Sequence, residues 1–225
     1  MTIDLNVDLG EGGRDDDALT ALASSVNIAC GGHAGDRDSM SRAVALALQH
    51  GSAIGAHPSF PDRANFGRRA LELPLLEITR SVVSQIEALA RLADLHHVKP
   101  HGALYNEAQR EEDLAEAIVE GVSRVLPTTI IYTLPGGALA RAAREAGHEV
   151  AGEGFIDRGY QENGELVPRS DPGALLAGQD ALEQALRLAA RGDIATLCVH
   201  GDSPEALSLL REVRARLEGF VISQP

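Results

Sequence analysis

Short apolar or β-branched runs alternate with helical patterns along nearly the whole chain. Eight such runs predict strands, at residues 2–9, 24–30, 52–57, 95–101, 128–134, 148–155, 195–200 and 219–223. Between most of them, apolar residues recur at the spacing of an amphipathic helix. The predicted helices cover residues 36–50, 74–93, 114–126, 137–147, 182–192 and 204–217. Because strand and helix alternate, we expect an α/β fold with parallel strands and right-handed crossovers.

Two architectures fit this alternation. Seven or eight strands in 225 residues form either an open doubly wound sheet or a compact barrel, although a regular eightfold barrel usually takes about 250 residues. No linker, repeat or low-complexity segment divides the chain, so we expect one domain over residues 1–225. Gly147 and Gly192 follow two predicted helices, at the position where glycine commonly ends a helix.

Polar residues follow several of the predicted strands in the same way. Four of the eight histidines come after an apolar run and before a turn: His33, His57, His101 and His200. Charged residues follow other strands or these histidines: Asp8, Glu11, Asp36, Glu153, Asp157, Arg158 and Asp202. Because the carboxyl ends of parallel strands meet at one face, we expect a ring of polar side chains there. The other histidines are interpreted as structural or surface residues: His50, His96, His97 and His148.

One lysine stands out in the composition. Of the 20 basic residues, 19 are arginine, and the exception is Lys99, two residues before His101. Arginine can replace lysine wherever a solvated positive charge is sufficient. A position that keeps lysine therefore indicates a compact point charge or a group whose pKa can be shifted.

Charge and composition narrow the function classes. The formal charge of −13 argues against sequence-independent binding to nucleic acid, which needs a basic surface. No apolar run reaches the roughly 20 residues of a membrane span, and the N-terminal residues lack the pattern of a signal peptide. Cys30 and Cys198 lie far apart in apolar runs and are expected to be buried, reduced thiols. We expect a soluble cytoplasmic protein that binds neither nucleic acid nor membrane.

The polar ring supports two kinds of hydrolytic chemistry. Histidines and carboxylates can bind a divalent metal that activates water, and the candidate ligands are Asp8, His33, His57 and His200. Alternatively, carboxylates act as general bases while Lys99 and His101 stabilise a developing oxyanion. The chain contains no HExxH, P-loop, GxGxxG or GxSxG motif, so both routes remain open.

Six motifs in order carry a family resemblance: DLNVDLGEG, NIACGGHAGD, GAHPSFPDRANFGRR, HVKPHGALYN, FIDRGYQENGELVPRS and CVHGD. They closely resemble the 5-oxoprolinase A-subunit family, also called LamB/YcsF. The resemblance implies a compact (β/α)7–8 barrel-like fold with parallel strands, of the glycoside hydrolase and deacetylase type. It also implies hydrolysis of the lactam 5-oxo-L-proline to L-glutamate, with ATP as cosubstrate hydrolysed to ADP and phosphate. Activity in that family requires partner subunits B and C.

The resemblance also assigns site residues. The catalytic positions it implies are Asp8, Glu11, His33, Lys99, His101 and Asp157. The implied substrate-binding positions are His57, Asp62, Arg63, Tyr105, Asn106, Glu153, Arg158, His200 and Asp202. We hypothesise that Asp8, Glu11 or His33 activates water, that Lys99 neutralises charge on the substrate, and that Arg158 clamps the substrate carboxylate. ATP is expected on a partner subunit or at the turn of residues 135–137.

One position departs from the family pattern. The first histidine motif has Gly32 where we expect an aromatic residue, and this change is expected to widen the pocket or alter substrate fit. Two alternatives to the 5-oxoprolinase interpretation stay open. A metal-dependent, deacetylase-like carbohydrate hydrolase would work without ATP, and a non-catalytic subunit would bind the lactam while its partners perform the chemistry.

Overall fold

Seven parallel strands form a closed barrel in the computed structural model, which describes residues 2–201, 203, 205–217 and 221–222. The barrel strands are β1 (Thr2–Leu9), β2 (Ser25–Ala29), β3 (Ala53–His57), β4 (His97–Val98), β5 (Ile130–Thr133), β6 (Val150–Phe155) and β7 (Thr196–Val199). Each pairs in parallel with the next, and β1 pairs with both β2 and β7. An eighth strand, β8 (Val221–Ile222), pairs with the start of β1. The ring of pairings is that of a barrel and not of an open sheet.

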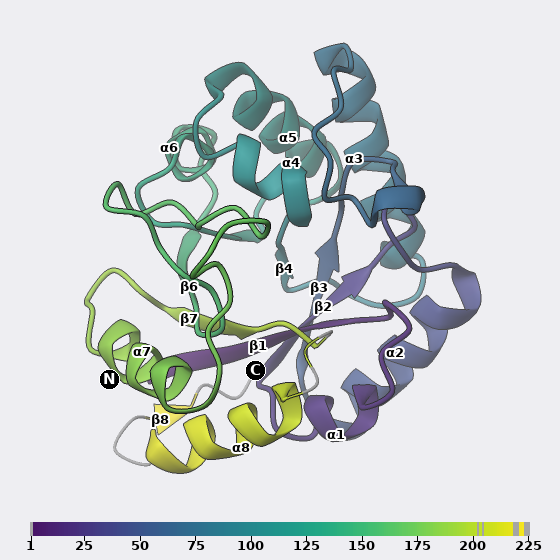
Figure 1. Ribbon diagram of the computed structural model, residues 1–225. Helices are drawn as coiled ribbons and strands as arrows, with labels where there is room; N and C mark the ends of the chain where they lie inside the picture. Colours follow the sequence, from purple (N-terminus) through teal and green to yellow (C-terminus); the bar gives the residue numbers. More distant parts are fainter. Residues whose placement is uncertain (1, 202, 204, 218–220, 223–225) are drawn as a thin grey trace.

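Helices surround the barrel, as Figure 1 shows. They are α1 (Asp16–Thr20), α2 (Arg37–His50), α3 (Leu75–Ala90), α4 (Gly102–Glu107), α5 (Glu112–Val125), α6 (Ala138–Glu145), α7 (Gly178–Ala189) and α8 (Ala206–Arg216), with a 3₁₀ turn at Arg63–Asn65. Among the described residues, no helix has both the length and the apolar character needed to cross a membrane.

Most predicted elements are confirmed, with differences at the ends of helices. Gly147 has a φ of 87° directly after α6, which confirms its predicted role in ending that helix. The prediction for Gly192 is wrong, because α7 ends at Ala189 and Ala190 caps it in a right-handed conformation. Two short helices, α1 and α4, were not predicted, since five or six residues are too few for a helical period to be recognised.

The strands bury both of their faces, but the two faces differ in chemistry. In β1, Leu5, Val7 and Leu9 belong to the apolar core that also contains residues of the surrounding helices. The alternate positions along the strands, together with Lys99 just after β4, form the other face, which is largely polar and includes Asn6, Asn27, His97, Lys99, Glu153 and Thr196. None of these six is more than 2% exposed. The apolar core therefore lies outside the barrel wall, and the interior is a polar layer that leads to the C-terminal ends of the strands.

Candidate active site

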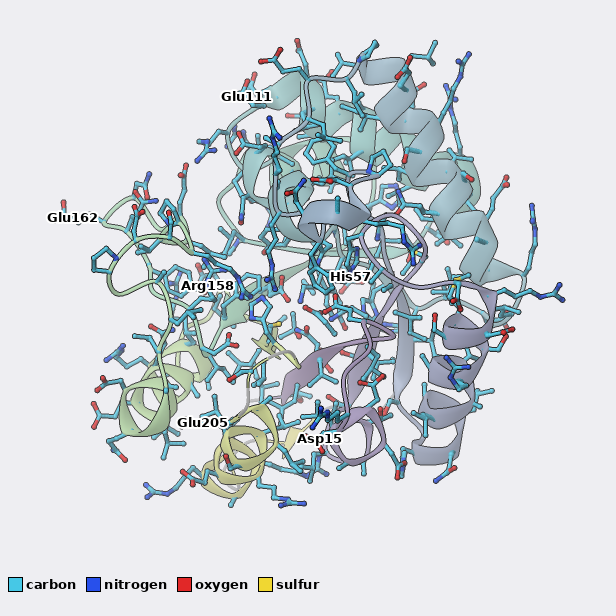
Figure 2. The ribbon with its side chains drawn as sticks, turned by 45° about the vertical axis from the view of Figure 1, so that its right-hand side comes forward. Asp15, His57, Glu111, Arg158, Glu162 and Glu205 are labelled. Atoms are coloured by element: carbon cyan, nitrogen blue, oxygen red, sulfur yellow. The ribbon has the colours of Figure 1, made fainter. Side chains whose placement is uncertain are left out.

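A cavity of about 410 Å³ lies at the C-terminal ends of the strands. Its lining includes Asp8, His57, Lys99, His101 and His200, which come from four strands or from the residues that follow them. Figure 2 shows His57 near the centre of the molecule, with Arg158 to one side of it. The volume falls in the usual range of small-molecule sites, about 300–1,000 Å³.

Lys99 lies at the base of this site among oxygen and sulfur acceptors. Its Nζ is 3.0 Å from Asp8 Oδ1 and 3.0 Å from Glu153 Oε1. It also donates to Asn6 Oδ1 at 3.2 Å and to Cys198 Sγ at 3.0 Å. Burial by itself would lower the pKa of Lys99, but the carboxylates of Asp8 and Glu153 raise this pKa well above its ordinary value. The ammonium group therefore stays charged and connects β1, β6 and β7.

Three histidines and one carboxylate form a second cluster in the site. Glu11, His33, His57 and His101 each offer a ligand atom, and these four atoms lie within 4.8 Å of one another. His33 Nε2 is 2.8 Å from Glu11 Oε1, and the His33 ring stacks on His101 with 3.6 Å between ring centroids. The described part of the chain thus contains a buried His/Glu cluster of the kind that can hold a metal ion.

Hydrogen bonds to backbone oxygens orient two of these rings. His57 Nδ1 donates to the carbonyl oxygen of Lys99 at 2.7 Å, and His101 Nε2 donates to that of Phe66 at 3.0 Å. A neutral imidazole has one N–H, so the other nitrogen of each ring is an acceptor. These two acceptors, His57 Nε2 and His101 Nδ1, face each other at 3.0 Å.

The pKa values of the site favour neutral imidazoles beside an ionised carboxylate. Burial lowers the pKa of His33 to about 4, and burial with the neighbouring His57 and His33 lowers that of His101 well below 6.5. For Asp8, burial would raise the pKa, but Lys99 and His57 together hold it well below its ordinary value. At neutral pH, the rings of His33 and His101 are therefore neutral, and Asp8 is charged.

Asp157 and His200 form a further pair at the rim of the same cavity. His200 Nδ1 is 2.9 Å from Asp157 Oδ1, and the His200 backbone N–H donates to Asp157 Oδ2 at 3.1 Å. This pair joins the segment after β6 to the end of β7. Asp8, Cys198 and His200 make a second set of converging ligand atoms. Burial raises the pKa of Cys198 well above its ordinary value, so this residue is a thiol at neutral pH.

Cationic side chains form another part of the cavity lining. They are Lys99, Arg68, Arg110, Arg158 and Arg169. Arg158 is 4% exposed, and it donates from Nε to the Ala174 oxygen and from Nη2 to the Val167 oxygen. Arg158 therefore holds the loop after β6 against the cavity as well as lining it. Burial lowers the pKa of Arg158 to about 10, which leaves it charged at neutral pH.

Not all residues assigned from sequence lie in the cavity. Tyr105, Asn106, Asp8, His57, Lys99, His101, Arg158 and His200 line it, and Glu153 contacts Lys99. Asp62 instead accepts hydrogen bonds from Asn65, while Arg63 donates to the backbone oxygens of Gly31 and Gly35. Asp36 caps α2. These three residues shape loops next to the site, and Asp202 lies outside the described residues.

The sequence interpretation missed polar residues inside the barrel. It assigned His97 to the structural or surface residues, yet His97 is fully buried, stacks on Tyr132 and donates from Nε2 to Asn27 Oδ1 at 2.8 Å. Asn27 in turn donates to Asp8 Oδ1 at 2.9 Å. A signal was present in HVKPH, because His97, Lys99 and His101 are spaced by two residues and therefore share one face of an extended chain.

The space beside Gly32 is filled by other side chains. A Cβ atom at Gly32 would overlap Gln85 Oε1 and Ser59 Oγ. Gln85 comes from α3, where its Nε2 donates to the Ser59 backbone oxygen at 2.8 Å and its Oε1 accepts from the Ser59 N–H. Gly32 is also absent from the residues that line the main cavity. The structure thus gives no sign of the wider pocket that the sequence suggested at this position.

The turn of residues 135–137, considered for ATP, is not part of the lining of this cavity, although Leu134 directly before it is. Pro135 and Gly136 line a different cavity of about 390 Å³. The backbone oxygens of Pro135 and Gly136 accept hydrogen bonds from Arg144 and Arg141 of α6.

These features define a class: a parallel (β/α) barrel with acid/base groups at the C-terminal end, an architecture shared with deacetylases. The catalytic domain of a peptidoglycan N-acetylglucosamine deacetylase from Eubacterium rectale ATCC 33656 is 10% identical, with a TM-score of 0.55 over 100% of this chain and 88% of that chain. A T48 deacetylase with substrate is 14% identical, with a TM-score of 0.51 over 100% and 87%. At these identities the likeness shows a common fold and nothing finer.

A more specific match gives the family. The chain is 38% identical to a lactam utilization protein from Thermus thermophilus, with a TM-score of 0.91 and 100% of both chains covered. The model of the LamB/YcsF family matches residues 3–224. The chain therefore belongs to the LamB/YcsF family, the 5-oxoprolinase A-subunit family. The resemblance and the barrel-like fold predicted from the motifs are confirmed.

Proposed function

We propose that this chain is the A subunit of an ATP-dependent 5-oxoprolinase, which hydrolyses 5-oxo-L-proline to L-glutamate while ATP is hydrolysed to ADP and phosphate. Membership of the LamB/YcsF family and the similarity to a lactam utilization protein support a lactam substrate. The observation that carries the proposal is the make-up of the cavity. It combines a carboxylate and two imidazoles at one end with four arginines elsewhere in its lining.

Each half of this lining matches one part of the proposed substrate. The lactam carries a carboxylate, and arginine is well suited to carboxylate recognition because its guanidinium donates two parallel hydrogen bonds. Arg158 is the buried arginine among the four in the lining, and we assign it to the substrate carboxylate. The lactam ring then reaches toward Asp8, His57 and His101.

ATP makes the chemistry feasible, because an unactivated five-membered lactam resists hydrolysis. Transfer of the γ-phosphoryl group to the lactam oxygen activates the ring carbon. One water then adds to this carbon and the C–N bond opens, and a second water releases phosphate. Of the three bases considered from sequence, Asp8 lines the cavity, whereas Glu11 and His33 are not among the lining residues. We therefore assign water activation to Asp8.

One buried hydroxyl in the cavity lining is available for the substrate. Among the described residues, the hydroxyl of Tyr105, Oε2 of Glu153 and Nδ1 of His33 are buried without a hydrogen-bond partner. Buried polar groups are nearly always satisfied in folded proteins. Tyr105 lines the cavity, and we assign its hydroxyl to a hydrogen bond with the bound lactam or the phosphorylated intermediate. Burial and the nearby Glu153 raise the pKa of Tyr105 well above its ordinary value, so it acts as a donor.

The proposal includes partner subunits B and C, and it places nucleotide binding on one of them or on the assembled complex.

The test is to combine the purified chain with its candidate partners and to measure glutamate formed from 5-oxoproline, with and without ATP. Asp8→Asn is expected to lower kcat at least 100-fold. Asp180→Asn, at the exposed start of α7, is the matched control and should leave the rate unchanged. Glutamate release by Asp8→Asn at the rate of the control would contradict the proposal.

The buried His/Glu cluster favours a second candidate function. On this alternative the chain is a metal-dependent hydrolase of carbohydrate amides, and it needs neither ATP nor partner subunits. Acetate release from N-acetylated sugar oligomers by the isolated chain would support this function. Dependence of glutamate formation on ATP and partners would support the first.

A further inference from the structure

We propose that His57 Nε2, His101 Nδ1 and Glu11 Oε1 bind a divalent transition-metal ion of the Zn²⁺ type. The proposal adds an ion to the site described above, and it rests on the proposed function only where it gives that ion a role in hydrolysis. It also differs from the ligand set considered from sequence, because Glu11 and His101 replace Asp8, His33 and His200.

The separations of the three atoms fit one small ion. His57 Nε2 is 3.0 Å from His101 Nδ1, His101 Nδ1 is 3.6 Å from Glu11 Oε1, and His57 Nε2 is 3.9 Å from Glu11 Oε1. Zinc binds imidazole nitrogen and carboxylate oxygen at about 2.0–2.2 Å, so two ligands of a tetrahedral site lie about 3.4 Å apart. The separation of the two nitrogens is shorter than this value, and the two separations that involve Glu11 Oε1 are longer.

The three atoms are also all acceptors. The backbone carbonyls that receive His57 Nδ1–H and His101 Nε2–H leave only a lone pair on the nitrogens that face each other. An ionised carboxylate is likewise acceptor-only, and Glu11 adds this third acceptor. Three acceptors directed at one another repel unless a cation or a proton lies between them.

The surroundings of the cluster are those of metal ligands. A metal-bound histidine usually donates its other N–H to a carbonyl or a carboxylate, which fixes the ring and its tautomer. His57 and His101 both do so, and His33 Nε2 donates to Glu11 Oε1 at 2.8 Å. Because the His33 ring is stacked almost parallel to that of His101, with 7° between planes, His33 orients Glu11 in this assignment and is not a ligand.

Charge and access favour a cation at this position. Asp8 and Glu153 each have a carboxylate oxygen 3.0 Å from Lys99 Nζ, and the Asp8 Oδ2 atom lies 3.5 Å from His57 Nε2. One ammonium does not balance the charge of these two carboxylates. His57 and His101 both line the cavity, so an ion held by three protein ligands keeps a coordination position toward it. That position is where water or the lactam oxygen would bind, as in catalytic zinc sites.

The test uses metal binding itself. The full chain is stripped of metal with a chelator, and Co²⁺ is added while the visible absorption of the ion is recorded; Zn²⁺ binding is measured by calorimetry. We expect one ion per chain. Glu11→Gln keeps the volume of the side chain and should weaken binding at least 10-fold, and His101→Ala should do the same. His50→Gln, at the exposed end of α2, is the control and should bind as tightly as the wild type.

Three results would overturn the proposal: no stoichiometric Co²⁺ binding by the wild type, unchanged affinity in folded Glu11→Gln, or loss of binding in His200→Gln but not in Glu11→Gln. The last result would place the ion at Asp8, Cys198 and His200. Circular dichroism establishes whether each variant is folded. If His101→Ala does not fold, the metal affinity of Glu11→Gln decides whether the proposal holds. Glutamate formation by metal-free protein would refute the ion's role in hydrolysis and leave the proposed function intact. Stoichiometric metal binding without glutamate formation in the reconstituted complex would support the metal site and contradict the proposed function.

Discussion

Lys99 shows how one residue combines structure and chemistry. Its ammonium group lies among Asp8, Glu153, Asn6 and Cys198 and is 2% exposed. The sequence hypothesis assigned Lys99 a direct contact with charge on the substrate. In the structure its charge is already balanced by Asp8 and Glu153, so its main effect is to keep Asp8 ionised and in place. A guanidinium group is larger and planar, and it would not fit among acceptors that converge on one point.

Replacing Lys99 should therefore lower the free energy of unfolding of the barrel. In Lys99→Met two buried carboxylates lose their shared cation, and breaking a buried pair of this kind typically costs about 3–5 kcal/mol. The measurement is the free energy of unfolding in urea. Arg191→Met is the matched control, because Arg191 pairs with Asp193 on the half-exposed surface and such pairs contribute less than about 1 kcal/mol.

A second substitution tests the reason for that loss. Adding Asp8→Asn to Lys99→Met removes one of the two unpaired charges, so part of the lost stability should return. If Lys99→Met costs no more than Arg191→Met, the buried ammonium does not hold the polar interior together as described.

Individual strands show how much of this site the sequence determines. The strands and the histidines at their ends follow from local patterns, because each needs only a few neighbouring residues. The alternation alone fits an open sheet or a barrel, and it was the family resemblance that favoured the barrel. The interior is harder to predict. In residues 95–101, the apolar context and the turn at Pro100 can be recognised from the sequence. The burial of His97, however, depends on Gly55 of β3, where any Cβ would overlap the His97 ring.

Contacts between loops also lie beyond the reach of the sequence. The tautomer of His101 is fixed by the backbone oxygen of Phe66, 35 residues away. The family resemblance assigned Arg63 to substrate binding, but in the structure Arg63 donates hydrogen bonds to the backbone at Gly31 and Gly35. Whether a residue contacts the substrate or holds a loop in place depends on which loops come together in the fold. No local sequence pattern determines these contacts between loops.

The junction of β6 and β7 gives a prediction at the scale of elements. Asp157, after β6, accepts hydrogen bonds from His200, after β7. Burial would raise the pKa of Asp157, but the interactions with His200 outweigh it and lower this pKa below the ordinary value. A carboxyl group whose pKa is lower in the folded state than in the unfolded chain stabilises the fold at pH values above its unfolded pKa, about 3.9. That contribution is lost as the pH falls through the folded pKa.

Asp157→Asn should therefore be less stable than the wild type at pH 7, and the difference should shrink as the pH falls below about 4. The measurement is the free energy of unfolding of both proteins from pH 3 to pH 7. A difference that stays constant over this range would show that Asp157 contributes through packing and not through its charge.

At the scale of the whole molecule, charge is distributed unevenly. The chain has a formal charge of −13, yet five cationic side chains line one cavity. Asp8, Glu107 and Glu165 line the same cavity and pair with Lys99 or Arg110, so the cationic excess comes from Arg68, Arg158 and Arg169. An excess of one sign of charge attracts ligands of the other sign, and this attraction weakens with salt when the charges are exposed. Arg68 is exposed and Arg169 is half-buried, so under the proposed function these two should guide an anionic lactam toward the site, and the more deeply buried Arg158 should bind it.

Arg68→Gln and Arg169→Gln should each raise the KM for 5-oxoproline several-fold at low ionic strength and change kcat little, because they act before the chemical step. The difference from wild type should shrink near 0.5 M salt, where the Debye length falls to about 4 Å. Arg42→Gln removes the same charge from the exposed side of α2 and is the matched control. The measurement is a set of steady-state KM values at several salt concentrations in the reconstituted complex. Equal KM values for Arg42→Gln and Arg68→Gln would mean that overall charge, and not the cavity lining, governs capture of the substrate.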